Sequence, residues 1–287
     1  MVFLETFKMP DRFATINEMD QKRTCYNNYY PFGMFVDKDL EEITFEPVTI
    51  FYGGNGSGKT TILNVMATAI GASRSSIFNK SSFFDEYISK CSFEVYNDGM
   101  SHGEIAKKII TSDDVFDYLF DIRNINENID TTRNDLLGEY TELKYAKFKF
   151  RSLDDYEQLK KINKARKNSG SEFVRSQLMN NVPCKSNGES AFWYFTQEIK
   201  ENGIYLLDEP ENSLSADLQL QLLDFIQDSA RFFNCQFIIS THSPFLLSME
   251  QAKIYDLDET PVRVKLWTEL ENVRKFYDFF REHSDEF

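Results

Sequence analysis

The sequence predicts an α/β fold in which helices cover a mostly parallel β-sheet. Short apolar segments of strand length recur at 48–52, 204–207 and 237–239. A helix is expected between the last two, at 216–233, because its apolar residues fall on one face. Strands that are buried on both faces consist of near-continuous apolar residues, and parallel strands need crossover connections. The alternation of such strands with helices therefore indicates a parallel sheet.

The N-terminal region predicts further strands. Within the first 50 residues we expect strands joined by a polar loop at 18–28. Residues 92–96 alternate like a strand and lead into a turn at Asn97-Asp98-Gly99. Residues 254–257 are apolar enough to form a third strand of the C-terminal part.

A glycine-rich segment follows the strand at 48–52. It reads Gly53-Gly54-Asn55-Gly56-Ser57-Gly58-Lys59-Thr60 and matches the phosphate-binding P-loop, G-x-x-x-x-G-K-[ST]. Its glycines let successive backbone N–H groups point at phosphate oxygens. Lys59 can reach the β- and γ-phosphates, and the Thr60 hydroxyl can bind Mg²⁺. From Thr61 onward the chain predicts a helix whose N-terminal dipole faces the phosphates. A chance glycine-rich turn is the alternative, but the flanking strand and helix disfavour it.

Between the P-loop helix and residue 183 the pattern is less regular. Ser112-Asp113-Asp114 is expected to cap a helix that runs through Val115, Tyr118 and Leu119, and residues 146–150 alternate like a strand. Residues 159–167 have a helical composition, which Asn168-Ser169-Gly170-Ser171 interrupts. We predict that residues 75–183 form a compact lobe inserted into one domain spanning 1–287.

The charge of the chain is negative and uneven. The formal net charge of −14 over 287 residues argues against a chain that coats nucleic acid unaided. Residues 144–175 hold ten Lys and Arg but four Asp and Glu, whereas residues 201–287 hold 17 acidic and seven basic residues. The basic stretch at 144–175 is either a surface for a partner or a solvated helix face.

Composition also bears on location. No run of about 18 apolar residues suggests a membrane span, and the N-terminus lacks the layout of a secretory leader. The four cysteines are scattered and form no C-x-x-C pair, which favours reduced thiols and a cytoplasmic protein; they are Cys25, Cys91, Cys184 and Cys235.

Two acidic residues close the strand at 204–207. Asp208 and Glu209 would lie at the carboxyl edge of the sheet, where open α/β folds bind ligands. Asp208 is placed to hold Mg²⁺, and Glu209 is placed to polarise the water that attacks a γ-phosphate. Adjacent acids are common on surfaces, but after a P-loop the pair predicts a Walker B motif.

A histidine follows the strand at 237–239. His242 could donate to the γ-phosphate and help position the attacking water. A lone histidine is more often a capping or core residue. Its place at the tip of a neighbouring strand favours the functional role.

Ser186 and Gly188 precede the helical run at 191–200. A serine and a glycine backbone at a helix N-terminus can bind an anion. In isolation the segment would be interpreted as a plain helix cap. Its position shortly before the Walker B motif favours an anion site.

These elements, in this order, resemble the ATP-binding-cassette (ABC) ATPases, most closely the soluble branch related to RecF and the SMC proteins and its small bacterial predicted ATPases. The resemblance rests on residues 45–64, 186–190, 203–211 and 236–244. It implies an ABC-type fold and a dimer, here a homodimer, that sandwiches two ATP molecules with Mg²⁺. It also implies that Ser186 and Gly188 contact the γ-phosphate bound by the other subunit's P-loop.

Other features of the ABC pattern are weaker here. The resemblance places the D-loop, which crosses the dimer interface, at residues 212–215. The signature is S-N-G-E rather than L-S-G-G-Q, and Gln158 and Gln177 are Q-loop candidates by position only. No aromatic residue is identified for adenine stacking.

The function expected from the sequence is Mg²⁺-dependent ATP binding and hydrolysis coupled to dimerisation. The dimer would act on DNA or on a partner effector such as a nuclease, for example in DNA repair or phage defence. Two alternatives are the motor subunit of a membrane transporter and an ATP-binding switch with little turnover. The interval between Thr60 and Asp208 is too short for a long coiled-coil arm with a zinc hook.

Overall fold

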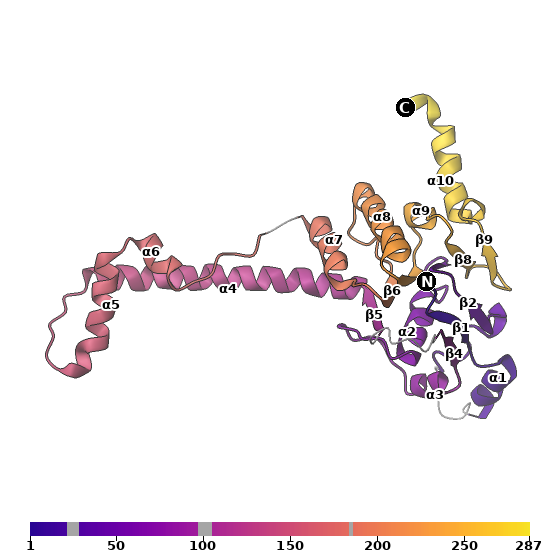
Figure 1. Ribbon diagram of the computed structural model, residues 1–287, viewed down its shortest axis with the longest axis horizontal. Helices are drawn as coiled ribbons and strands as arrows, with labels where there is room; N and C mark the ends of the chain where they lie inside the picture. Colours follow the sequence, from indigo (N-terminus) through magenta and orange to yellow (C-terminus); the bar gives the residue numbers. More distant parts are fainter. Residues whose placement is uncertain (22–28, 97–104, 184–185) are drawn as a thin grey trace. The chain divides into compact units, whose positions relative to one another are not determined.

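The chain forms two compact units (Figure 1). The computed structural model describes residues 1–21, 29–96, 105–183 and 186–287. Unit 1 consists of Met1–Phe116 with Ser186–Phe287, and unit 2 consists of Asp117–Lys185. The predicted turn at 97–99 and two of the cysteines, Cys25 and Cys184, lie outside the described residues. Cys91 and Cys235 have free thiols.

The main element of unit 1 is a six-stranded sheet with the order β5-β6-β7-β3-β8-β9. All of its neighbouring strands are parallel except the hairpin of β8 and β9. The strands are β5 (Ala106–Thr111), β6 (Gly203–Asp208), β7 (Cys235–Ser240), β3 (Val48–Tyr52), β8 (Lys253–Asp256) and β9 (Arg263–Lys265). Because β7 lies between β3 and β6, the carboxyl ends of these three strands meet at one edge of the sheet.

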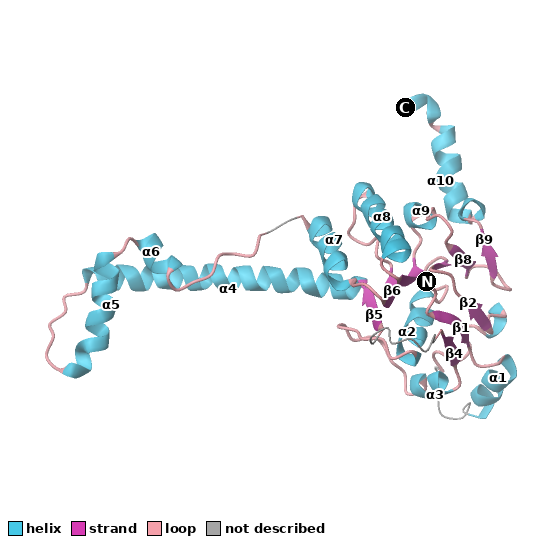
Figure 2. Ribbon diagram, viewed as in Figure 1, coloured by secondary structure: helices cyan, strands magenta, loops and turns pink. Residues whose placement is uncertain are grey.

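Helices cover both faces of this sheet (Figure 2). On one side α2 (Lys59–Ala69) packs against β6 and β7, and on the other α8 (Ala216–Phe232) packs against β7 beside α7 (Asn187–Glu198) and α9 (Pro244–Leu247). Every residue of β3, β6 and β7 is buried, as double-sided cover requires. The predicted α/β class with a mostly parallel sheet is confirmed.

A second, antiparallel sheet has the order β2-β1-β4. Its strands are β1 (Leu4–Lys8), β2 (Glu42–Thr44) and β4 (Ser92–Val95), the last close to its predicted bounds. Phe7 and Ile43 from this sheet share a core with Leu63 of α2 and Leu206 of β6. The α2 helix is therefore held between the two sheets. The short helix α3 (Phe84–Ser89) packs against α2, and α10 (Glu271–Glu282) lies near the C-terminus.

The predicted loop at 18–28 is wrong in its first part. Helix α1 spans Arg12–Gln21. The Asp11 carboxylate accepts hydrogen bonds from the backbone N–H groups of Phe13 (2.9 Å) and Ala14 (3.3 Å) and so caps this helix. The polar composition of this segment suggested a loop, whereas the cap at Asp11 marks the start of a helix.

Unit 2 is helical. The 34-residue helix α4 (Ser112–Tyr145) begins at Ser112, so the three residues predicted as its cap form its first turn; it starts in unit 1 and continues into unit 2. It is followed by α5 (Tyr156–Lys167) and α6 (Gly170–Arg175). Tyr140 packs on Phe173 with ring centroids 5.6 Å apart. The break predicted at 168–171 spans only the two residues between α5 and α6.

The predicted strand at 146–150 is wrong, because this segment is part of the connection between α4 and α5 and forms neither helix nor strand. Five alternating residues do not make a strand without a neighbouring strand to pair with. The lobe boundary also differs from the predicted 75–183. Residues 75–116 belong to unit 1, where β5 pairs with β6. None of the helices in the described part of the chain combines the length and apolar character needed to cross a membrane.

Candidate functional site

The glycine-rich loop lies between β3 and α2, where the sequence predicts a phosphate-binding loop. Gly56 and Gly58 have φ angles of 82° and 104°, in the left-handed region that favours glycine. A Cβ atom on Gly53 would come within 2.5 Å of Ser57 Oγ. The loop therefore needs glycine at these positions for its fold.

Lys59 is the buried cation of this loop, with an exposure of 5%. Its Nζ atom donates hydrogen bonds to the carbonyl oxygens of Gly53 (2.7 Å) and Gly54 (3.1 Å). It also lies 3.4 Å from Glu209 Oε1. A pocket of about 240 Å³ is lined by the loop, Met34, Lys59, Thr61 and Glu209. The predicted P-loop lysine and Walker B glutamate thus share one pocket.

Asp208 lies at the end of β6, next to Thr60. Thr60 Oγ1 donates to Asp208 Oδ1 at 3.2 Å, and Ser240 Oγ at the end of β7 also donates to that oxygen. Burial raises the pKa of the Asp208 carboxyl, while the two hydroxyl hydrogen bonds act in the opposite direction. The structure brings together the two predicted Mg²⁺ ligands, Thr60 and Asp208, although 148 positions separate them.

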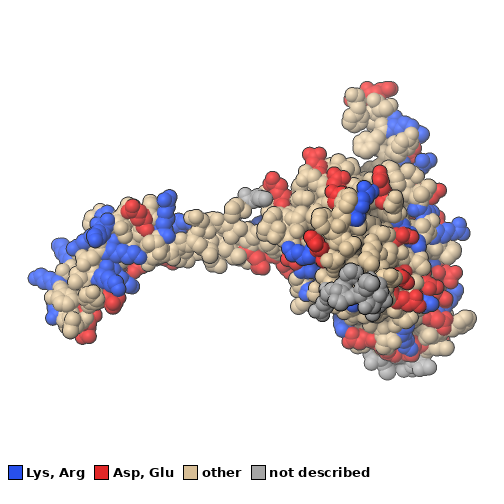
Figure 3. All heavy atoms as spheres, in the orientation of Figure 1, with Lys and Arg blue, Asp and Glu red and all other residues tan. Residues whose placement is uncertain are grey.

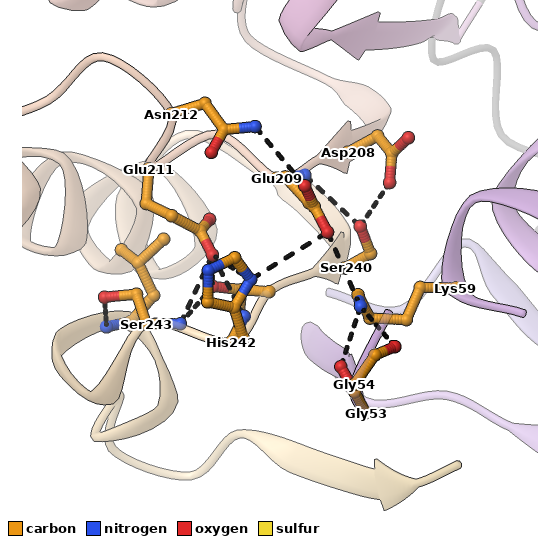
Figure 4. A network of polar contacts seen from close by, with 12 residues as sticks. Gly53, Gly54, Lys59, Asp208, Glu209, Glu211, Asn212, Ser240, His242 and Ser243 are labelled. Carbon is orange, nitrogen blue, oxygen red and sulfur yellow. Dashed lines mark hydrogen bonds and ion pairs between the residues drawn. The ribbon is translucent and has the colours of Figure 1, made fainter. Parts of the chain in front are cut away.

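Glu209 is held in an unusual backbone conformation, with φ at 48°. Its backbone N–H donates to Ser240 O at 3.0 Å, which fixes it to the end of β7. Asn212 Nδ2 donates to Glu209 Oε2 at 3.3 Å, and the other oxygen faces Lys59 and His242 (Figure 4). The carboxylate is thus aimed at the pocket by contacts on several sides.

His242 lies on the loop after β7 and is about half exposed. Its Nδ1 atom is 3.8 Å from Glu209 Oε1 and 3.4 Å from Glu211 Oε1. The backbone N–H of Thr241 donates to Phe51 O at 3.2 Å, so the loop is also attached to the strand that precedes the P-loop. The histidine therefore stands beside the glutamate that was predicted to activate water.

Two charged residues brace the loop from outside and were not predicted. Both oxygens of the Asp258 carboxylate accept from the N–H of Gly54, at 3.0 and 2.8 Å. Lys38 Nζ donates to the carbonyl oxygens of Ser57 and Leu257, each at 2.6 Å. Burial lowers the pKa of Lys38, which the nearby carboxylates of Asp258 and Asp256 oppose. Asp258 follows a predicted strand, so the strand-end rule that identified Asp208 could have identified it.

Ser186 and Gly188 lie apart from this pocket, since neither is among the residues that line it. Ser186 is the N-cap of α7, and its Oγ accepts from the N–H of Glu189 at 3.2 Å. A Cβ atom on Gly188 would come within 3.0 Å of the carbonyl oxygen of Ser213. The cap and the close packing both occur within one subunit, and an anion site built from these residues stays a prediction.

The two Q-loop candidates lie in unit 2. Gln158 is part of α5, and Gln177 follows α6 with its Nε2 atom donating to Phe173 O at 3.2 Å. Neither is among the residues that line the P-loop pocket, so their role stays a prediction.

The residues around the pocket fit a nucleotide and a divalent cation. Ser57 Oγ is buried and has no hydrogen-bond partner among the described residues. Thr60 Oγ1 and the Asp208 carboxylate supply the oxygen ligands that Mg²⁺ prefers. Within the described residues no group of three or more His, Cys, Asp and Glu could hold a metal by itself. A cation at this edge would therefore share its coordination with phosphate oxygens and water.

Comparison with known proteins identifies one family. A family model described as an AAA domain matches residues 27–267. The match agrees with the predicted class, a P-loop ATPase. No curated protein matches the chain in a sequence search.

Solved structures resemble the chain at low identity. One is an Smc head domain derived from Pyrococcus furiosus, with 15% identity, coverage of 98% of this chain and 100% of that one, and a TM-score of 0.38. A nucleotide-free ATP-binding cassette from an ABC transporter has 15% identity, coverages of 97% and 96%, and a TM-score of 0.42. A dimeric ATP-binding cassette bound to ADP and Pi has 13% identity, coverages of 80% and 91%, and a TM-score of 0.35.

Proposed function

The chain belongs to the AAA domain family of P-loop ATPases, and on this premise we propose that it binds ATP at residues 53–61 and hydrolyses its γ-phosphate. The observation that supports hydrolysis is the convergence of three side chains at one sheet edge. Glu209 lies 3.4 Å from Lys59 Nζ and 3.8 Å from His242 Nδ1. Catalysis of phosphoryl transfer consists mainly of positioning and charge stabilisation, and these groups can supply both.

Each side chain has a separate role in this proposal. Lys59 stabilises negative charge on the β- and γ-phosphates. Glu209 accepts a proton from the attacking water, and His242 donates a hydrogen bond to the γ-phosphate. Thr60 and Asp208 would hold Mg²⁺, which would neutralise charge on the phosphate oxygens.

The proposal includes an ATP-dependent homodimer. Ser186 is exposed, and its segment does not line the P-loop pocket of its own subunit. In the dimer Ser186 and Gly188 would complete the pocket of the other subunit. The segment around Ser186 and Gly188 would then contact the ATP bound by the other subunit, which it does not do in its own subunit.

Replacing Lys59 tests ATP binding. Lys59→Ala is expected to weaken ATP affinity at least about tenfold, because a hydrogen bond to a charged group contributes about 1.5–3 kcal/mol. Isothermal titration with ATP and Mg²⁺ measures the affinity. Lys80→Ala is a matched control, since Lys80 pairs with Asp85 away from the pocket and should bind ATP like the wild type. Equal affinities of the wild type and a folded Lys59→Ala protein would refute the assignment of the loop.

Steady-state turnover distinguishes the ATPase from an ATP-binding switch, which would bind ATP but scarcely hydrolyse it. Identification of the proteins that co-purify with the native chain distinguishes the remaining alternatives. A membrane protein would favour the transporter motor, and a nuclease or DNA would favour the soluble effector.

Unit 2 offers a second candidate function, the binding of DNA. Lys and Arg side chains gather over α5 (Figure 3), and the cations of the 144–175 stretch are mostly exposed. Some acidic residues of this stretch are occupied by backbone caps. The Asp155 carboxylate accepts from the N–H groups of Arg151 (2.9 Å) and Ser152 (3.2 Å). Exposed aromatic rings, including Tyr145 at 76% and Tyr156 at 55%, lie among the cations and could stack on bases.

Charge reversal on α5 tests this second function. The variant in which Lys160, Lys161, Lys164 and Lys167 are all changed to Glu is expected to lose DNA binding and keep basal ATPase activity. Binding of the wild type should fall steeply with salt, because phosphate contacts release counterions. Fluorescence anisotropy with labelled oligonucleotides measures both effects.

A control variant carries the same total charge change on unit 1, at Lys8, Lys80, Lys253 and Lys275. It should bind DNA like the wild type if the effect belongs to unit 2. Absence of DNA binding by the wild type at low salt, with ATP present, would refute this function and leave the ATPase proposal intact.

A further inference from the structure

Glu211 is a buried carboxylate just after the Walker B pair, with an exposure of 7%. Its Oε1 atom accepts three hydrogen bonds from consecutive residues of the loop after β7. The donors are the hydroxyl of Thr241 at 2.6 Å and the backbone N–H groups of His242 at 2.9 Å and Ser243 at 3.2 Å (Figure 4). One oxygen atom thus fixes the backbone on both sides of His242.

Burial of this carboxylate needs such partners. An ionised carboxylate in a dry environment is unfavourable unless hydrogen bonds or charges compensate it. The compensation comes almost wholly through Oε1, since Oε2 is buried without a hydrogen-bond partner among the described residues. If this position served packing alone, an apolar side chain would stabilise the fold at least as well. The buried carboxylate therefore points to another role.

The imidazole ring of His242 also lies close to this Glu211 oxygen. Its Nδ1 atom lies 3.4 Å from Glu211 Oε1 and 3.8 Å from Glu209 Oε1. Both carboxylates therefore face the Nδ1 edge of the ring, and Nε2 is left for other contacts. The side chain itself is about half exposed, so packing alone restrains it weakly.

A second brace of the loop leaves His242 untouched. Ser243 Oγ donates to Gln219 Oε1 at 2.7 Å, and Gln219 in turn donates to Leu214 O at 3.0 Å. This contact fixes the start of α9. Among these bracing side chains, Glu211 is the one that contacts His242 itself.

We propose that Glu211 is the positioning residue for His242, holding its backbone and ring beside Glu209 in the geometry needed for hydrolysis. This inference rests on the proposed ATPase function. Glu211 links the segment after β6, which carries Glu209, to the loop after β7, which carries His242.

The test is a double-mutant cycle on turnover and ATP affinity. Glu211→Ala is expected to lower kcat by up to about 10²-fold, since misplacement of a catalytic group by about 1 Å can have such an effect. The Kd for ATP should change less than about twofold, because Glu211 does not line the P-loop pocket. Glu211→Gln should restore most of kcat, as its amide oxygen can accept the same hydrogen bonds.

The His242→Ala background decides whether Glu211 acts through the histidine. There Glu211→Ala should lower kcat by less than about twofold further, because the group it positions is gone. Equal losses in both backgrounds, or no recovery in Glu211→Gln, would overturn the inference. If Glu211→Ala does not fold, Glu211→Asp can replace it in both backgrounds. Aspartate keeps the carboxylate charge, but its shorter side chain cannot reach the three donors in the same way.

A control variant separates this result from a general loss of stability. Gln236 is fully buried and accepts from the N–H groups of Phe3 (3.0 Å) and Leu4 (2.7 Å), at the opposite end of β7. Gln236→Ala should therefore lower stability and leave kcat unchanged. Absence of turnover in the wild type would refute the ATPase proposal and this inference together, whereas equal losses in both backgrounds refute only the inference.

Discussion

Glu209→Gln is expected to slow ATP hydrolysis by about 10²- to 10⁴-fold, the range typical for loss of a general base. The amide has nearly the shape of the carboxylate and keeps an oxygen that can accept from Asn212, 3.3 Å away in the wild type. It cannot accept a proton from water at neutral pH. The loss should therefore fall on the chemical step.

ATP affinity of the same variant should stay equal or rise. Lys59 Nζ lies 3.4 Å from Glu209 Oε1, so the carboxylate would compete with phosphate for the lysine. Removal of its charge ends this competition. The ATP-bound state should accumulate, and with it the proposed dimer.

Single-turnover kinetics and size-exclusion chromatography with ATP and Mg²⁺ measure the two effects. Glu250→Gln serves as the control, because Glu250 is an exposed acid that lies 3.9 Å from Arg231. It should leave both turnover and elution unchanged. Wild-type turnover in Glu209→Gln would show that another group activates the water.

Four of the predicted site residues share one physical origin. Asp208, Glu209 and His242 lie at or just after the ends of β6 and β7, and Lys59 follows β3 through the P-loop; β3, β6 and β7 are buried at every residue. Apolar strands are visible in a sequence, and parallel strands bring their carboxyl ends to one edge. The strand pattern is therefore sufficient to group Lys59, Asp208, Glu209 and His242 at one site.

The parts that were missed depend on contacts between distant residues. Asp258 accepts from Gly54, which is 204 positions away, and Lys38 donates to Leu257, 219 positions away. The end of the predicted strand at 254–257 marks Asp258 as a candidate, but no local pattern specifies which distant residue it or Lys38 contacts. Helix α1 was missed for a different reason, because its cap at Asp11 was hidden in a polar stretch. The strand predicted at 146–150 rested on alternating apolar and polar residues. Such alternation is not sufficient, because a strand also needs a neighbouring strand to pair with.

Ser186→Arg is expected to abolish ATP turnover while leaving ATP binding intact. The alternative role of Ser186 is that of a helix cap only, because its Oγ accepts from the N–H of Glu189 at the start of α7, at 3.2 Å. Loss of a cap alone would lower the free energy of unfolding by about 1 kcal/mol and leave catalysis nearly unchanged. Ser186 is exposed, so the arginine fits without overpacking the subunit.

A matched control exists in unit 2. Ser186 N also donates to Glu189 Oε2 at 3.0 Å, and Ser169 caps α6 with the same reciprocal pair of bonds: it accepts from Glu172 N at 3.3 Å and its N–H donates to Glu172 Oε2 at 2.9 Å. Ser169→Arg should lower stability by a similar amount and keep basal turnover. Thermal unfolding with turnover assays compares the two variants, and similar turnover in both would reduce Ser186 to a helix cap.

Mixing Ser186→Arg with Lys59→Ala protein tests whether the site is shared between subunits. Each variant alone should be inactive, since every pocket in its homodimer has one defect. A mixed dimer has one pocket with both defects and one with neither, so part of the activity should return. Turnover of the mixture, with mixed dimers verified by differential tagging, measures this recovery. Mixed dimers that form without any recovery would contradict a composite site whose two pockets work independently.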